Sequence, residues 1–192
     1  MTQEIFLFDT QLFIFINHLP HNSILDIFFG IVTLVGYFGA IWIFIAIFLY
    51  IKNKIKYKKM LISVILASFS SFVLSELILK NLIQRQRPQY EINTTILPFD
   101  FYHSFSFPSG HACIAFAAAL VLSKYNKQKK WLFYLLAFLI SFSRIYLGKH
   151  YPSDVLAGAI LGLIIGKLSF KITSQIMPKP LSTPGVEKRG KS

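Results

Sequence analysis

The architecture of this chain is clearest in residues 107–124, FPSGHACIAFAAALVLSK. A short polar cluster, Pro108 to His111, is followed at once by an apolar run rich in alanine and leucine, which favours a helix. Proline is favourable at the first helical position because its missing N–H would have no partner there. We therefore expect a helix that begins at Pro108 and carries Ser109, Gly110 and His111 in its first turn.

Apolar runs on both sides of this segment are long enough to cross a bilayer. A membrane-spanning helix needs roughly 20 residues at about 1.5 Å per residue. Four clear spans are predicted, at 60–80, 108–124, 130–147 and 153–172. Residues 22–51 form a longer run that crosses once or twice, with Gly36 and Gly39 as its natural breaking point. Residues 4–18 predict a short helix that lies in the membrane interface or packs on the bundle.

The composition agrees with a membrane protein. Apolar residues make up 54% of the 192-residue chain and charged residues 15%, whereas a soluble domain carries about 25% charged residues. We predict an all-α, polytopic membrane helix bundle with five to six transmembrane helices and a short interfacial N-terminal helix. The chain divides into an interfacial segment (1–21), a membrane-embedded domain (22–174) and a basic, disordered cytoplasmic tail (175–192).

The net charge of +12 follows the topology of such a bundle and does not indicate a nucleic-acid partner. Fifteen of the 20 basic residues lie at 52–59, at 124–130 and from Lys167 onward, next to predicted helix ends. Positive charge marks the cytoplasmic side of a membrane protein and attracts anionic lipid headgroups there. Alternation of the spans then places residues 81–107 and 148–152 on the opposite side of the membrane.

The remaining basic residues lie in or beside three polar clusters on that opposite side. The clusters are Lys80 with Arg87–Pro88, Pro108 to His111, and Ser143–Arg144 with His150 and Asp154. Charged groups are costly inside or beside a membrane, so their presence there indicates a function. Cations, histidines and a carboxylate gathered on one rim are typical of a site that handles phosphate.

Two of the clusters open predicted helices. The first turn after Pro108 offers unpaired N–H groups and the positive end of the helix dipole to an anion, and Gly110 lets that anion approach the backbone. Pro152 opens the last helix, which places Asp154 in its first turn. His150 then lies within reach of the Asp154 carboxylate, which can fix the tautomer and leave the other ring nitrogen as a nucleophile or base.

The cations of these clusters also have simpler interpretations. Lys80 ends a long span, where it can snorkel to the surface or pair with Glu76 four residues earlier. For Arg85 we favour solvent or an acidic headgroup over chemistry. Arg144 offers a planar fork that suits phosphate oxygens.

The order Lys-x6-Arg-Pro, Pro-Ser-Gly-His and Ser-Arg-x5-His-x3-Asp resembles the three-part signature of the type-2 phosphatidic acid phosphatase superfamily. This family includes bacterial integral-membrane lipid phosphate and diphosphate phosphatases and is related to vanadium haloperoxidases. Every signature position matches, at Lys80, Arg87, Pro88, Pro108, Ser109, Gly110, His111, Ser143, Arg144, His150 and Asp154. The signature covers residues 80–154, and the helical pattern around it agrees to about residue 172.

The resemblance implies a mechanism. His150, oriented by Asp154, would attack phosphorus and form a phospho-histidine, and His111 would protonate the leaving lipid oxygen. The phosphate oxygens would be bound by Lys80, Arg87, Ser109, Gly110 and Arg144. Because side-chain cations would supply the charge, no metal and no other cofactor is expected.

The resemblance also implies a membrane lipid phosphate as substrate and the lipid bilayer as surroundings. An undecaprenyl diphosphate-type carrier is the first choice, with phosphatidylglycerol phosphate, phosphatidic acid and lipid A as rivals. Residues 89–107 are expected to form a lid-like loop that decides among them. The predicted location is the bacterial inner (cytoplasmic) membrane, with the site facing the periplasm or the cell exterior. The sequence does not predict the oligomeric state.

Other functions stay open at this point. A lipid-linked phosphotransferase would use the same phospho-enzyme but pass the phosphate to an acceptor. A non-catalytic membrane protein would keep the fold without turnover, although the complete set of two histidines and an aspartate argues against it. The predicted membrane spans disfavour a haloperoxidase.

Overall fold

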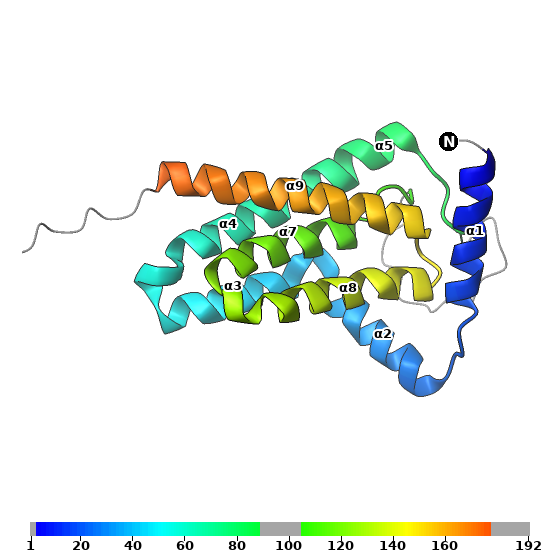
Figure 1. Cartoon of the computed structure of the whole chain (residues 1–192), viewed down its shortest axis with the longest axis horizontal. Helices are drawn as coiled ribbons and strands as arrows, with labels where there is room; N and C mark the ends of the chain where they lie inside the picture. Colours follow the sequence, from blue (N-terminus) through cyan, green and yellow to red (C-terminus); the bar gives the residue numbers. More distant parts are fainter. Residues whose placement is uncertain (1–2, 89–104, 178–192) are drawn as a thin grey trace, which may run out of the picture.

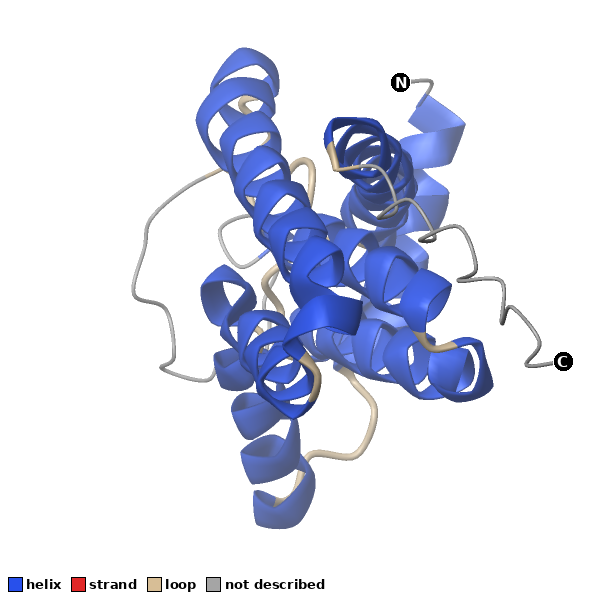
Figure 2. Ribbon diagram, turned by 90° about the vertical axis from the view of Figure 1, so that its left-hand side faces the viewer, coloured by secondary structure: helices blue, strands red, loops and turns tan. Residues whose placement is uncertain are grey.

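The computed structural model describes residues 3–88 and 105–177, and every regular element in them is a helix (Figures 1 and 2). In chain order the elements are α1 (Gln3–Asn17), α2 (Ser23–Val35), the 3-10 turn η1 (Tyr37–Gly39), α3 (Ala40–Lys52), α4 (Lys54–Phe72), the π-helical segment η2 (Val73–Leu79), α5 (Lys80–Ile83), α7 (Gly110–Tyr125), the 3-10 turn η3 (Lys127–Lys129), α8 (Lys130–Tyr146) and α9 (Pro152–Ile176). The predicted all-α fold class is confirmed. Most of the predicted lid loop (89–107) and of the predicted basic tail (175–192) lies outside the described residues.

Two of the described helices are long and apolar enough to cross a membrane. They are Lys54–Ile83, which joins α4, η2 and α5, and Pro152–Ile176, which is α9. A third span results if α2 and the helical segment Tyr37–Lys52 are counted as one, and these two meet at 51°. The membrane helix bundle is as predicted, whereas the count of five to six crossings stays a prediction.

The chain bends between α2 and α3 at the glycines that the sequence marks. Gly39 has φ +75°, a left-handed conformation that glycine adopts without strain. Phe38 has φ +50°, which is costly for a large side chain and which proteins retain mainly at functional sites. Phe38 and its neighbour Tyr37 both line the cavity described below.

The alanine-rich α7 lies inside the bundle, with α4, α8 and α9 packed around it. α9 runs parallel to α7 (Figure 1) and contacts it through Gly158, Gly162 and Gly166. A Cβ atom on any of these glycines would overlap the backbone of α7 or of its N-cap residue Ser109, and the Cys113 carbonyl oxygen is the atom nearest to Gly162. This close contact holds the N-terminal ends of α7 and α9 side by side.

α1 lies across the end of the bundle at which α7 and α9 begin (Figure 1). Its Phe13 is fully buried against Ile145 and Tyr151, whereas Phe8 and Phe15 are 67% and 69% exposed. The helix therefore packs on the bundle and also presents apolar side chains outward, as an interfacial helix does. The lysine-rich turns before α4 and before α8, together with the C-terminal end of α9, lie at the opposite end of the molecule (Figure 1).

Candidate active site

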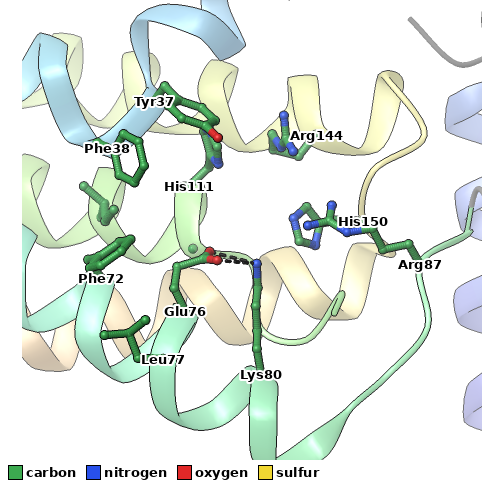
Figure 3. Close-up of a pocket in the computed structure, with 12 residues that line it drawn as sticks. Tyr37, Phe38, Phe72, Glu76, Leu77, Lys80, Arg87, His111, Arg144 and His150 are labelled. Atoms are coloured by element: carbon green, nitrogen blue, oxygen red, sulfur yellow. Dashed lines mark hydrogen bonds and ion pairs between the residues drawn. The ribbon is translucent and has the colours of Figure 1, made fainter. Parts of the chain in front are cut away.

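A cavity of about 160 Å³ lies beside the first turn of α7. Its polar part is formed by Glu76, Lys80, Arg87, Gly110, His111, Arg144 and His150. Its apolar part is formed by Tyr37, Phe38, Phe72, Leu77 and Ile114. Figure 3 shows the aromatic rings of Phe38 and Phe72 on one side of this space and Arg87, Arg144 and His150 on the other. Six of the eight predicted site residues line the cavity, and the other two, Ser109 and Asp154, do not.

Three buried cations come together here from distant parts of the chain. Lys80 begins α5, Arg87 follows it in the next segment, and Arg144 lies in the last turn of α8. Arg87 Nη1 donates to the Lys149 carbonyl oxygen at 3.0 Å, and Arg144 Nη1 donates to Thr33 Oγ1 at 2.9 Å. These bonds fix the orientation of the two planar guanidinium groups. The cluster favours an anion with several oxygens, such as a phosphate.

α7 begins two residues later than the sequence predicts. Gly110 is its first residue, and Ser109 is its N-cap, whose hydroxyl accepts a backbone N–H of the first turn at 3.5 Å. The prediction that Pro108 occupies the first helical position is wrong, because Ser109 has extended dihedral angles (φ −71°, ψ 112°) and stands between Pro108 and the helix. Gly110 and His111 do lie in the first turn. The Ser109 N–H donates to the Asp154 carbonyl oxygen at 3.0 Å.

His150 and Asp154 lie next to each other at the start of α9. Pro152 is the first residue of this helix, as predicted, and Asp154 Oδ2 accepts the Tyr151 N–H at 2.8 Å. His150 Nδ1 lies 3.6 Å from the same Oδ2 and 3.5 Å from the Ser106 hydroxyl, which itself donates to Asp154. Nδ1 thus faces the carboxylate, and Nε2 lies on the other side of a ring that lines the cavity. This geometry favours the tautomer that keeps the Nε2 lone pair.

Burial and charge both keep His150 neutral. Withdrawal from water is the main cause that holds the pKa of His150 well below its usual value of 6.5, and the three positive charges of the cavity lower that pKa further. At neutral pH the imidazole is therefore uncharged, and its lone pair is available to an electrophile.

His111 faces the same cavity from the first turn of α7. Its Nε2 atom is buried and has no hydrogen-bond partner within the part of the chain that the structure describes. The ring centroid lies 5.5 Å from that of Tyr37. A buried nitrogen without a partner costs free energy unless a ligand supplies that partner. His111 is therefore placed to exchange a proton with a ligand in the cavity.

Arg85 does not face solvent or a headgroup, so this prediction is wrong. Only 11% of its side chain is exposed. Its Nη1 donates to Asp154 Oδ1 and its Nη2 to Asp9 Oδ2, both at 2.7 Å. Asp9, in α1, also accepts the Ser153 N–H at 2.8 Å. Arg85 therefore links α1 to the carboxylate of Asp154.

We expect Arg85→Ala to destabilise the protein by about 3 kcal/mol or more. The change leaves the fully buried Asp154 carboxylate without its guanidinium partner and also removes the ion pair between Arg85 and Asp9. The measurement is the thermal unfolding midpoint of the purified protein in detergent. Lys54→Ala, which removes an exposed cation at the other end of the bundle, serves as the control. Equal midpoints for the two variants would contradict this account.

Three further polar residues belong to the site although no role in it was predicted for them from the sequence: Asp9, Thr33 and Ser106. Asp9 carries one signal, since a carboxylate in an apolar interfacial helix is costly unless it is paired. Thr33 and Ser106 carry none, because small hydroxyl residues are common in helices and loops alike. Among residues 3–88 and 105–177, no group of three or more His, Cys, Asp or Glu side chains is placed to hold a metal ion.

Fold and site together define a membrane protein whose anion pocket is built around two histidines. Comparison with known proteins assigns it more closely. Residues 56–178 match the PAP2 superfamily, and the chain belongs to this superfamily. The resemblance drawn from the three motifs is confirmed.

Relatives in sequence and in structure cover most of the chain. The undecaprenyl-diphosphatase of Sulfolobus acidocaldarius is 32% identical over 170 residues, which cover 87% of this chain and 79% of that protein. The crystal structure of Aquifex aeolicus LpxE matches with a TM-score of 0.71 and 35% identity, covering 89% of this chain and 99% of that one. The crystal structure of a PAP2-type phosphatidylglycerolphosphate phosphatase from Bacillus subtilis matches with a TM-score of 0.67 and 26% identity, covering 92% and 90%.

Proposed function

We propose that this protein hydrolyses the phosphate of a membrane lipid through a phospho-histidine formed on His150. The observation that carries the proposal is the placement of that ring. The Nδ1 atom of His150 lies next to Asp154 and Ser106. The ring also lines a cavity that contains three cationic side chains. Membership in a superfamily with phosphatase relatives supports lipid phosphate hydrolysis as the reaction.

The first step transfers the phosphoryl group to the enzyme. The Nε2 lone pair of His150 attacks phosphorus, and the bond between phosphorus and the lipid oxygen breaks. That oxygen takes a proton from His111, whose protonated form is favoured once the negative charge of the bound phosphate lies in the cavity. Positive charge around the equatorial oxygens stabilises the transition state, and the cavity supplies it through Lys80, Arg87 and Arg144.

The second step releases the phosphate. A water molecule attacks the phosphorus of the phospho-histidine, His111 accepts a proton from this water, and the phosphorus–nitrogen bond breaks. Inorganic phosphate leaves, His150 regains its lone pair, and His111 regains its proton. The Asp154 carboxylate holds the His150 ring in the same orientation through both steps.

The apolar part of the cavity supports a lipid substrate. Phe38 and Leu77 line the cavity, and their side chains are also 62% and 53% exposed on the outside of the bundle. A prenyl or acyl chain in the bilayer can therefore contact these side chains while its phosphate lies among the cations. The relatives include an enzyme named for a diphosphate and one named for a phosphomonoester, so both kinds of lipid are candidates.

The proposed orientation places the site away from the cytoplasm. The lysine-rich turns and the C-terminal end of α9 lie at the end of the bundle opposite to the cavity (Figure 1). Positive charge favours the cytoplasmic side, so the cavity would open toward the periplasm or the cell exterior of an inner membrane.

The test is release of inorganic phosphate by the purified full-length protein in detergent, with a chelator present. The panel is farnesyl phosphate, farnesyl diphosphate, phosphatidic acid and phosphatidylglycerol phosphate. We expect release from at least one lipid without added metal, because three cations already supply the charge that a metal would bring. Release from none of them would contradict hydrolysis. Phosphate transfer that requires an added alcohol would indicate a phosphotransferase, and loss of activity on chelation would contradict metal independence.

A further inference from the structure

Glu76 places a negative charge inside a pocket that is otherwise cationic. Both of its carboxylate oxygens accept hydrogen bonds from Lys80 Nζ at 2.8 Å. Its side chain is 19% exposed, and it is the one acidic side chain among the described residues that line the cavity. The pairing of Glu76 with Lys80 that the sequence allows is therefore present, and it lies within the proposed reaction site.

Gly110, in the first turn of α7, leaves the space that the Glu76 carboxylate occupies. A Cβ atom on Gly110 would overlap Glu76 Oε1, so the absence of a side chain at Gly110 makes the room that Glu76 occupies. The sequence predicts that Gly110 admits an anion to the backbone, and the anion that lies there in this structure is the Glu76 carboxylate. Glu76 belongs to η2, and π-helical segments occur frequently at functional sites.

The carboxylate lies where the leaving group of the proposed reaction would be. Figure 3 shows it beside Lys80, below His111 and on the side of Lys80 away from His150. In phosphoryl transfer the nucleophile and the leaving oxygen lie on opposite sides of phosphorus. With His150 as nucleophile and His111 as proton donor, the group attached to the leaving oxygen is next to Glu76.

On the basis of the proposed function, we infer that Glu76 makes the site discriminate against lipid diphosphates and in favour of lipid phosphomonoesters. In a monoester the group beyond the leaving oxygen is an uncharged carbon. In a diphosphate it is a second phosphate, whose negative charge would face the Glu76 carboxylate in a partly buried pocket where charges are weakly screened. Repulsion of one substrate class is a common source of specificity.

The experiment compares farnesyl phosphate and farnesyl diphosphate, which share one chain, in the wild type and in Glu76→Gln. The ratio of kcat/KM for the diphosphate to that for the monophosphate is expected to rise about tenfold or more in Glu76→Gln. Glu76→Asp, which keeps the charge, should retain the wild-type direction of preference. Glu4→Gln removes an exposed carboxylate from α1 and should leave the ratio unchanged.

A different role for Glu76 predicts a different result. If Glu76 only holds Lys80 in place, Glu76→Gln changes both substrates by the same factor, and the unchanged ratio would overturn the inference. A lack of turnover on both lipids in the wild type would contradict the proposed function instead. In that case the inference about Glu76 is tested by measuring the binding of inorganic phosphate and of methylenediphosphonate with titration calorimetry. It predicts that Glu76→Gln tightens binding of the diphosphonate about tenfold more than that of phosphate, and equal changes would overturn it.

Discussion

Replacing His150 with alanine is expected to reduce phosphate release from lipid phosphates by about 10⁴-fold or more. The His150 imidazole lines the cavity, and its Nδ1 atom lies 3.6 Å from Oδ2 of the buried Asp154 carboxylate. Without it, the cations can still bind the phosphate, but no side chain is placed to accept the phosphoryl group. We therefore expect kcat to fall much more than KM changes.

The measurement is steady-state release of inorganic phosphate. In addition, the protein is labelled with a ³²P-lipid, and the stability of the label to acid and to base is determined. A phospho-histidine is stable to base and labile to acid, and this label should be absent from His150→Ala. His18→Ala, which removes an exposed histidine just after α1, is the matched control. Turnover of His150→Ala at the rate of this control would remove His150 from the mechanism.

Replacing His111 with alanine is expected to slow hydrolysis of an alkyl lipid phosphate by about 10³-fold. An alkoxide is a poor leaving group, so its departure depends on the proton that His111 would supply. A nitrophenyl phosphate that carries an alkyl chain needs no such proton. Its first turnover should be slowed less than about tenfold by the same substitution.

The two steps separate in the pre-steady state. Because His111 would also act as the base toward water, His111→Ala should release about one equivalent of nitrophenol in a burst and then turn over slowly. Equal losses on the alkyl and nitrophenyl substrates, with no burst, would show that His111 binds the phosphate and does not exchange protons.

Much of the site could be predicted from the sequence because its motifs are local. Pro152 and Asp154 stand in the first turn of one helix, and His150 lies only two residues before that helix, so the short spacing predicts that His150 and Asp154 meet. The membrane spans follow from apolar runs, which depend on length and composition. The sequence predicts the start of α7 two residues too early because both a proline and a serine can precede a helix, and in the structure Ser109 is the N-cap.

The remaining contacts could not be predicted because they join segments that no local pattern relates. Arg85 binds Asp9, which lies 76 positions earlier in the chain, and Arg144 binds Thr33, 111 positions earlier. Nothing in the residues around Arg85 distinguishes a buried network from a solvated cation. Glu76 shows the reverse case: its pairing with Lys80 was apparent, but its place in the cavity depends on Gly110 from another helix.

The glycine contact between α7 and α9 has a consequence for how the protein adapts to its membrane. The two helices meet backbone against backbone at Gly158, Gly162 and Gly166, with no long side chains between them that can rearrange. A bilayer that becomes thicker or thinner makes helices tilt. Here both helices must tilt together as one rigid unit. His111 on α7 and Asp154 on α9 therefore keep their relative position along the membrane normal. Lipid composition can then change how far a headgroup must travel to reach the pocket while the distance between His111 and Asp154 stays constant.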